Sequence, residues 1–232
     1  MFRILLLSVV LFMSSTASAQ LLSFSTRFGS AETKVVFGVV NGRVAFIEQR
    51  VSDGRCELQN ISTNGVINGH VSVFTGDGIN RVRVISTQWD LAGTFCGRTV
   101  TRMGRFIGAP TSFMIKGGAG NDIFLSSGHF TQIMAGAGHD TIVSHDHTSL
   151  NGEDGDDYII ELNDLNLDGG FAGALGGGPG NDRLCDLANG SNMDGGIGTD
   201  WRWNANRALN FEGMMSNGDE CGTVALIVLW SM

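Results

Sequence analysis

Proline is nearly absent from this chain, with 2 residues among 232, whereas glycine contributes 34. The glycines have no period of three, which excludes a collagen-like triple helix. Positive charge is also scarce, because 15 lysines and arginines stand against 23 aspartates and glutamates, for a formal net charge of −8. This acidic balance argues against a nucleic-acid partner, since phosphate backbones recruit lysine and arginine.

Long apolar runs are missing as well. Residues 4–13 and 224–230 form the two dense apolar runs, and both are too short to cross a bilayer as a helix. The first run follows Arg3 and precedes the small-x-small sequence 17–19, which predicts a secretory signal peptide over residues 1–19. Its removal, with Arg3, leaves 14 basic and 23 acidic residues and a formal charge of −9. We therefore expect a secreted, extracellular protein without a membrane span, with the periplasm as an alternative location.

Cysteine is limited to Cys56, Cys96, Cys185 and Cys221. An even number of cysteines in an exported chain predicts two disulfides. Three pairings are possible, and the alternative is a set of free, buried thiols. We favour Cys56–Cys96 and Cys185–Cys221, because each of these pairs lies within one region of the chain.

Familiar catalytic signatures are not found. The chain has neither a Gly-x-Ser-x-Gly elbow nor a His-Glu-x-x-His motif, and the mature part has no sustained helical period with caps. A histidine-rich stretch could suggest zinc, but its spacing matches no established zinc pattern, and exposed polar residues are the favoured interpretation. The stretch comprises His129, His139, His145, Asp146 and His147.

What the chain does contain is a repeat. Five related nonapeptides read GGAGNDIFL, AGAGHDTIV, GEDGDDYII, GGPGNDRLC and GGIGTDWRW, and they begin at Gly117, Ala135, Gly152, Gly177 and Gly195. Each has an aspartate at its sixth position: Asp122, Asp140, Asp157, Asp182 and Asp200. Four have an apolar residue at the eighth: Phe124, Ile142, Ile159 and Leu184. Glycine permits tight turns, so each copy predicts a turn, a carboxylate and a short strand.

The spacing of the copies predicts how they stack. Successive copies start 18, 17, 25 and 18 residues apart. If nine residues make one turn and one strand, 18 residues make a full coil, and all five motifs share one edge. The opposite, plain edge then holds units with an inward apolar residue: Ile133, Leu150, Leu167 and Met193. The long interval predicts a glycine-rich loop over residues 169–176.

The flanking segments are predicted to cover the ends of this stack. Two β-rich runs around Asn41-Gly42 predict an N-terminal hairpin, and residues 75–83 form a degenerate copy with Asn80 at position six. Residues 224–230 predict a final strand that covers the last coil. The expected division is a signal peptide (1–19), an N-terminal β-rich cap with degenerate coils (20–116), the repeat block (117–203) and a C-terminal cap (204–232).

The five copies resemble the nonapeptide Gly-Gly-x-Gly-x-Asp-x-U-x, with U apolar, of RTX proteins, also called haemolysin-type calcium-binding repeats. Ala135 and Glu153 depart from it by replacing glycines. The resemblance covers residues 117–203 and implies an all-β fold, a right-handed parallel β-solenoid of the RTX β-roll type. It also implies Ca²⁺ between stacked turns, since calcium takes six to eight oxygen ligands and one turn cannot supply them.

The same resemblance implies ligand sets for three ions. The first set is Asp122 with the carbonyls of Gly118 and Gly120, and Asp140 with those of Ala135 and Ala137. The second is Gly136, Gly138 and Asp140 with the turn that ends at Asp157. The third is Gly178, Gly180 and Asp182 with the turn that ends at Asp200. The long interval leaves open whether Asp157 stacks on Asp182.

We therefore expect an exported calcium-binding protein with a structural, adhesive or matrix-associated role. Its partners would be calcium ions and the extracellular matrix, a cell surface or a polysaccharide. One alternative is a metal-free solenoid in which Asp and Asn satisfy backbone N–H groups. Another is a secreted lyase or epimerase of acidic polysaccharide, with a groove lined by Asp77, Arg81, Arg83, Arg98, Arg102 and Arg105; a non-enzymatic role is favoured.

Overall fold

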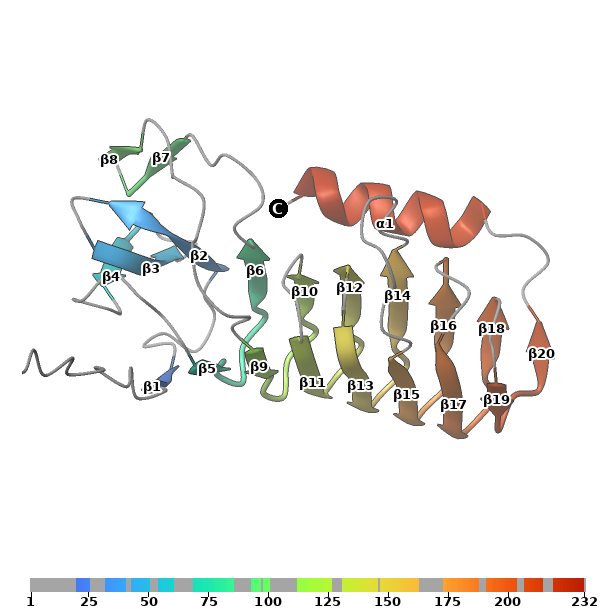
Figure 1. Ribbon diagram of the computed structural model, residues 1–232. Helices are drawn as coiled ribbons and strands as arrows, with labels where there is room; N and C mark the ends of the chain where they lie inside the picture. Colours follow the sequence, from blue (N-terminus) through green and yellow to red (C-terminus); the bar gives the residue numbers. More distant parts are fainter. Residues whose placement is uncertain are drawn as a thin grey trace, which may run out of the picture.

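A computed structural model describes most of the chain after residue 19 (Figure 1). The described residues are 20–25, 32–40, 43–50, 54–60, 69–85, 93–96, 98–100, 112–126, 131–145, 147–162, 173–187, 191–203, 207–214 and 219–231. The predicted signal peptide lies outside these ranges.

Two sheets contain nearly all the strands. The first, sheet A, has the order β1 (Gln20–Ser25), β5 (Gly69–Phe74), β9 (Ser112–Lys116), β11 (Thr131–Ala137), β13 (His147–Asp154), β15 (Ala174–Pro179), β17 (Asn192–Ile197), β19 (Arg207–Leu209). The second, sheet B, has the order β20 (Gly213–Met214), β18 (Trp201–Trp203), β16 (Arg183–Asp186), β14 (Tyr158–Leu162), β12 (Thr141–His145), β10 (Ile123–Ser126), β6 (Arg81–Ile85), β2 (Glu32–Val40), β3 (Arg43–Arg50), β4 (Cys56–Asn60). A separate pair joins β7 (Gly93–Phe95) to β8 (Arg98–Val100).

Apart from the β7–β8 pair, the chain alternates between the two sheets from β5 to β20, so it advances as a stack of coils (Figure 1). Neighbouring strands of the repeat are parallel and in register: Ile123 pairs with Thr141, Thr141 with Tyr158, and Tyr158 with Arg183. This register places the same position of every nonapeptide in one row. The all-β prediction is therefore confirmed in its coarse form, as two mainly parallel sheets.

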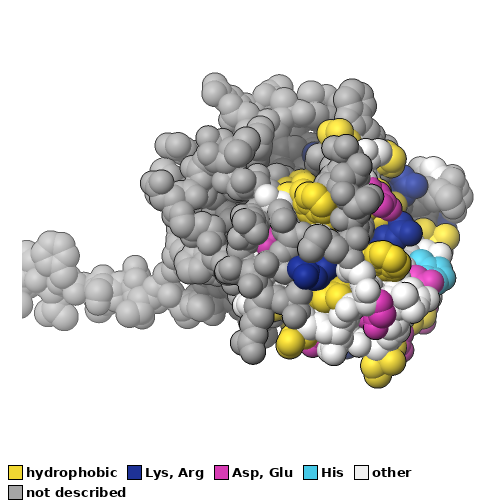
Figure 2. Space-filling model, turned by 90° about the vertical axis from the view of Figure 1, so that its right-hand side faces the viewer, with side chains coloured by type: hydrophobic (Ala, Val, Ile, Leu, Met, Phe, Trp, Pro, Cys, Tyr) yellow, Lys and Arg dark blue, Asp and Glu magenta, His cyan; other side chains and the backbone are white. Residues whose placement is uncertain are grey.

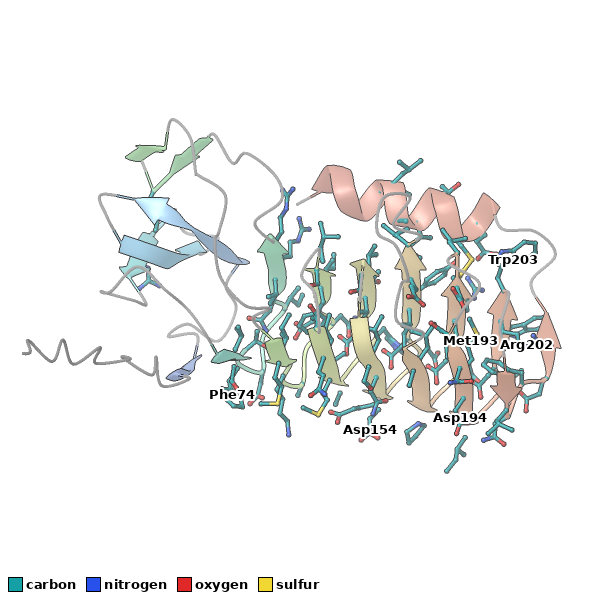
Figure 3. All side chains as sticks on the ribbon, in the orientation of Figure 1. Phe74, Asp154, Met193, Asp194, Arg202 and Trp203 are labelled. Carbon is teal, nitrogen blue, oxygen red and sulfur yellow. A yellow bond between two sulfur atoms is a disulfide. The ribbon has the colours of Figure 1, made fainter. Side chains whose placement is uncertain are left out.

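The core lies between the sheets and is built from two apolar rows (Figure 3). The eighth positions of the repeats supply one row from sheet B, and all are fully buried: Val82, Phe124, Ile142, Ile159 and Leu184. Sheet A supplies the other row, which is at most 2% exposed: Ile115, Ile133, Leu150, Leu175 and Met193. Side chains alternate across a strand, so the pattern of period two sends these residues to one side of each sheet.

One member of the sheet A row was assigned wrongly from the sequence. Leu175 pairs with Leu150 and Met193 and fills the inward place that was predicted for Leu167, which lies outside the described residues. The predicted loop over residues 169–176 is also wrong at its end, because Ala174–Gly176 belongs to β15. The spacing alone could not show where in a 25-residue interval the extra residues lie.

The N-terminal prediction corresponds to β2 and β3, which are antiparallel with Val40 opposite Arg43. Residues 41 and 42, the predicted turn, lie outside the described ranges. Strand β2 of this hairpin pairs with β6 in parallel, so the hairpin extends sheet B beyond the first coil. Both disulfides have the favoured pairing, Cys56–Cys96 and Cys185–Cys221.

The predicted C-terminal strand is wrong, because residues 219–231 form an α-helix, α1 (Asp219–Ser231). The helix crosses the strands of sheet B on the side away from sheet A (Figure 1). Cys221 and Ala225 are buried there, and Val224 packs against the same cluster. Spacings of three and four residues place these side chains on one helical face, and the bond from Cys221 to Cys185 fixes this face to β16.

The helix α1 covers a row of apolar side chains at the ninth positions of the repeats. Their ninth positions, which are unrestricted in the nonapeptide pattern, are apolar and at most 4% exposed: Leu125, Val143, Ile160 and Cys185. They point away from the inter-sheet core and pack against α1. Strands that carry apolar residues on both faces need a cover on both faces, and α1 is that cover.

Candidate functional site

Every repeat turn lies on the same edge of the stack, where a sheet A strand passes into a sheet B strand. The turns join β9 to β10, β11 to β12, β13 to β14, β15 to β16 and β17 to β18. We call this the turn edge, and the space between two successive turns a gap. The prediction that all five motifs share one edge is consistent with this arrangement, and it brings the five sixth-position aspartates into one row.

The aspartate row is continuous, and we call it the carboxylate ladder. Each aspartate is at most 2% exposed, and its Oδ1 accepts a hydrogen bond from the backbone N–H of the sixth residue in the preceding turn. The bonds run from Asn80 to Asp122 (2.6 Å), Asp122 to Asp140 (2.6 Å), Asp140 to Asp157 (2.8 Å), Asp157 to Asp182 (2.8 Å) and Asp182 to Asp200 (2.8 Å). The degenerate copy at 75–83 thus begins the ladder through Asn80.

The long interval does not interrupt the ladder. Tyr158 pairs with Arg183 in sheet B, and the Arg183 N–H donates to the carbonyl of Asp157 at 2.8 Å. The question that the sequence left open is therefore answered: Asp182 stacks on Asp157 as the other aspartates stack on one another. The extra residues fall between β14 and β15 in the sequence, largely outside the described ranges.

The second carboxylate oxygen, Oδ2, lacks a hydrogen-bond partner within the described part of the chain in four of the ladder aspartates. Oδ2 of Asp140, Asp157, Asp182 and Asp200 is buried without a hydrogen-bond partner among the described residues. Asp157 Oδ2 lies against Gly152, in space that a side chain there would occupy, and the Gly177 carbonyl of the next turn approaches the same space. Asp182 Oδ2 and the Gly195 carbonyl meet in the same way beside Gly177. Oxygen atoms from both turns thus converge in each of these gaps.

Further carbonyl groups face the gaps from both sides. Those of Gly118 and Gly120 point at the glycines of the next turn, Gly136 and Gly138, and the Ala135 carbonyl points back at Gly117. Gly178 and Gly180 repeat this arrangement three turns later, where their carbonyls point at Gly196 and Gly198. Several of these groups already take part in hydrogen bonds between turns, such as Ala137 N–H to the Gly118 carbonyl at 2.8 Å. Six of the carbonyls that the resemblance implies as ligands therefore face the gaps: Gly118, Gly120, Ala135, Gly138, Gly178 and Gly180.

Burial controls the electrostatics of the ladder. Desolvation raises the pKa of Asp157 to about 8, of Asp122 and Asp182 to about 7, and of Asp140 to about 6. The backbone hydrogen bonds oppose this rise, and neighbouring acidic groups add to it at each of these sites. Burial also raises the pKa of Asp200. The ladder at neutral pH is thus poised between its protonated and ionised forms.

A buried, unpartnered Oδ2 can be satisfied in two ways, by a proton or by a cation. A proton on Oδ2 turns it into a donor for the carbonyl that approaches the same glycine. A cation in the gap instead neutralises two ionised carboxylates and uses the carbonyls as additional ligands. Without either, the ionised ladder buries several negative charges in a row, which is strongly unfavourable.

A second row runs along the outside of the turn edge, at the fifth positions. Here Asn121 Oδ1 accepts from His139 N–H (2.9 Å), His139 Nδ1 from Asp156 N–H (3.1 Å), Asp156 Oδ1 from Asn181 N–H (2.8 Å), and Asn181 Oδ1 from Thr199 N–H (3.0 Å). These side chains are exposed. His139 therefore serves as a member of this hydrogen-bonded row of turn residues. The other members of the histidine-rich stretch have side chains outside the described part of the chain.

The opposite edge carries buried polar side chains, which the sequence did not reveal. They are Ser126, Thr131, Ser144, Glu161, Asp186 and Ser191. Ser126 bonds to Thr131 (2.9 Å), Ser191 N–H to Asp186 (2.7 Å), and the Ser191 hydroxyl to Glu161. Each of these residues has an interaction partner, unlike Oδ2 of Asp140, Asp157, Asp182 and Asp200, which has none among the described residues.

Glycine at the fourth position is expected to be indispensable. Gly180 has a φ of +155°, and a methyl group there would overlap the Gly155 carbonyl oxygen. Gly180→Ala should therefore lower the free energy of unfolding by about 2 kcal/mol or more, measured by urea denaturation. Gly176→Ala is the matched control, because its nearest neighbour would be a side-chain oxygen at 3.4 Å. Equal stability of the two variants would contradict the close packing of the turns.

Among the described residues, no group of three or more histidine, cysteine, aspartate or glutamate side chains could hold a metal ion by itself. A cation at the turn edge would therefore depend on backbone carbonyls as well as aspartates. No helix in the described ranges is long and apolar enough to cross a membrane. Comparisons of the chain with protein-family models, with curated proteins and with solved structures find no match.

Proposed function

We propose that this chain is an exported protein that binds Ca²⁺ in the gaps of the carboxylate ladder. The observation that carries the proposal is the set of unpartnered Oδ2 atoms, because those of Asp157, Asp182 and Asp200 are each buried beside a carbonyl oxygen from the next turn. Carboxylate and carbonyl oxygens are the ligands that calcium prefers, and calcium tolerates irregular geometry. The repeated nonapeptide supports the same choice of ion, and the fold we propose is a right-handed β-roll of the RTX type.

The residues that would hold calcium are those that border each gap. In the first gap between aspartate turns they are Asp122, Asp140 and the carbonyls of Gly118, Gly120, Ala135 and Ala137. The next gap combines Asp140 and the carbonyls of Gly136 and Gly138 with Asp157. Asp157 and Asp182 border a gap whose stacking matches the others, and Gly178, Gly180 and Asp182 with Asp200 complete the last. Bound ions would neutralise the ladder and tie each coil to the next.

Calcium binding of this kind stabilises the folded chain, because the ligands are brought together only when the coils stack. Two disulfides are typical of an oxidising compartment, where calcium is also abundant enough for weak sites to fill. We infer that the coils become fully ordered on binding calcium outside the cell, and that the calcium-bound protein has a structural, adhesive or matrix-associated role.

The polysaccharide-active alternative rests on Asp77, Arg81 and Arg83, which lie in or shortly before β6, while Arg102 and Arg105 lie outside the described residues. A shallow groove of about 450 Å³ on the outer face of sheet A includes Asn151, Asn192 and Asp194 in its lining. A second groove of about 510 Å³ includes Glu153 and Asp154 beside Lys116. Acidic side chains in these grooves would repel an acidic polysaccharide; Figure 3 labels Asp154 and Asp194 on the outer side of sheet A.

Asp140→Asn tests the proposal, because Asp140 borders two gaps. The amide keeps an oxygen for the Asp122 N–H but removes a charge from both gaps, so the variant should bind up to two fewer calcium ions, measured by equilibrium dialysis. Asp154→Asn makes the same chemical change at an exposed side chain and should bind as many ions as the unmodified chain. Equal calcium binding by both variants would exclude the ladder as the site.

A further inference from the structure

The chain makes one more coil after the fifth repeat, although the sequence there lacks the nonapeptide. β19 continues sheet A with Leu209 opposite Asp194, and β20 continues sheet B with Gly213 opposite Trp201. Residues 210–212 form the connecting turn and stack on the turn that ends at Asp200. The N–H groups of Glu212 and Gly213 donate to the Asp200 carbonyl at 3.1 and 3.3 Å.

In this added turn Glu212 takes the place of the ladder aspartate. Its Oε2 accepts a hydrogen bond from the Asp200 N–H at 2.5 Å, the same bond that each ladder aspartate makes with the preceding turn. The register explains the substitution, because Gly213 pairs with Trp201 and Glu212 therefore stands opposite Asp200. The turn is shorter than the others, and the longer side chain of glutamate reaches the position that aspartate occupies elsewhere.

The gap between Asp200 and Glu212 contains an unsatisfied buried oxygen. Asp200 is fully buried, and its Oδ2 has no hydrogen-bond partner within the described part of the chain. Asp200 Oδ2 lies 2.7 Å from the place where a side chain on Gly195 would begin, and the Asn210 carbonyl oxygen approaches the same place. Two carboxylates and one carbonyl thus border this gap, as in the gaps between repeats.

Asn210 is held in this arrangement by its own contacts. It has a φ of +55°, and its Nδ2 donates to Asp194 Oδ1 at 2.6 Å. Asparagine tolerates this left-handed conformation better than most residues. The side chain of Asn210 therefore anchors the turn to β17, and its carbonyl remains directed at Gly195.

We propose that Asp200, Glu212 and the Asn210 carbonyl form an additional divalent-cation site that closes the C-terminal end of the ladder; this rests on the proposed calcium binding. β19 and β20 are the last strands of their sheets, so no described strand stacks beyond them. Figure 2 shows the molecule from this end, with acidic side chains at its surface. Glu212 is exposed, whereas the ladder aspartates are at most 2% exposed.

Terbium luminescence tests this site, because Tb³⁺ substitutes for Ca²⁺ and emits when a nearby tryptophan is excited. Trp201 follows Asp200 directly, and its ring lies against Gly213. With the full, disulfide-bonded chain, Glu212→Gln should bind one Tb³⁺ fewer and lose most of the tryptophan-sensitised emission. The glutamine retains an acceptor for the Asp200 N–H, so the coil is preserved. Glu220→Gln, on α1, is the matched control and should behave as the unmodified chain.

The outcomes separate this site from the ladder. Unchanged stoichiometry and emission in Glu212→Gln, with ions still bound by the unmodified chain, would overturn the terminal site and leave the ladder sites standing. Absence of Tb³⁺ and Ca²⁺ binding by the unmodified chain would overturn both proposals. Loss of one ion in Glu212→Gln but not in Glu220→Gln would support the terminal site.

Discussion

In calcium-free buffer the free energy of unfolding is expected to fall by several kcal/mol as the pH rises from about 5 to about 8. Burial raises the pKa of Asp122, Asp140, Asp157 and Asp182 to between about 6 and about 8, whereas an aspartate in the unfolded chain titrates near 3.9. Between these values the folded state binds more protons than the unfolded state. The stabilisation of the folded state by these bound protons is complete below pH 4, and it is lost as the pH rises through the pKa values of the aspartates in the folded state.

Saturating calcium is expected to reverse this trend, because the ion binds the ionised ladder and protons compete with it. Urea denaturation at several pH values, with calcium and with chelator, measures how the free energy of unfolding changes with pH in each condition. Asp157→Asn removes the group with the highest pKa and should flatten the calcium-free slope. A calcium-free stability that rises over this range would contradict the account of the buried ladder.

Calcium is also expected to raise the thermal midpoint by more than about 10 °C at neutral pH. A ligand at 100 times its dissociation constant contributes about 2.7 kcal/mol per site, and the five aspartate turns enclose four gaps. For a domain of this size each kcal/mol shifts the midpoint by about 2–4 °C. Differential scanning calorimetry in calcium and in excess chelator measures the difference.

Magnesium provides the control for the thermal experiment. It demands near-octahedral geometry and gives up its water reluctantly, so it should raise the midpoint far less than calcium at equal concentration. The two disulfides remain intact throughout and stabilise the chain equally in all samples. A midpoint that is the same in calcium and in chelator would show that the ladder holds no calcium.

Much of the site follows from periodicity in the sequence. An interval of 18 residues is enough to place Asp122 and Asp140 on one edge, because two strands and two turns complete a coil. The apolar eighth residues follow from alternation along a strand. The disulfide partners were favoured only because they are near one another in sequence, and the structure has the same pairs.

Other features depend on contacts that a linear pattern does not contain. The helix α1 was mistaken for a strand because residues 224–230 are apolar without a helical period, yet apolar ninth positions such as Val143 and Ile160 required a cover. Glu212 was missed because its turn has a different length and composition from the repeats. The buried polar row around Glu161 and Asp186 became visible only when the opposite edge was assembled.

The decisive measurement is the number of calcium ions bound per chain, by equilibrium dialysis and elemental analysis at neutral pH. We predict about one ion for each of the four gaps between aspartate turns, all removed by chelator. A fully folded chain with no bound calcium at millimolar free calcium would contradict it, and would identify the ladder as a proton-stabilised row of carboxyl groups.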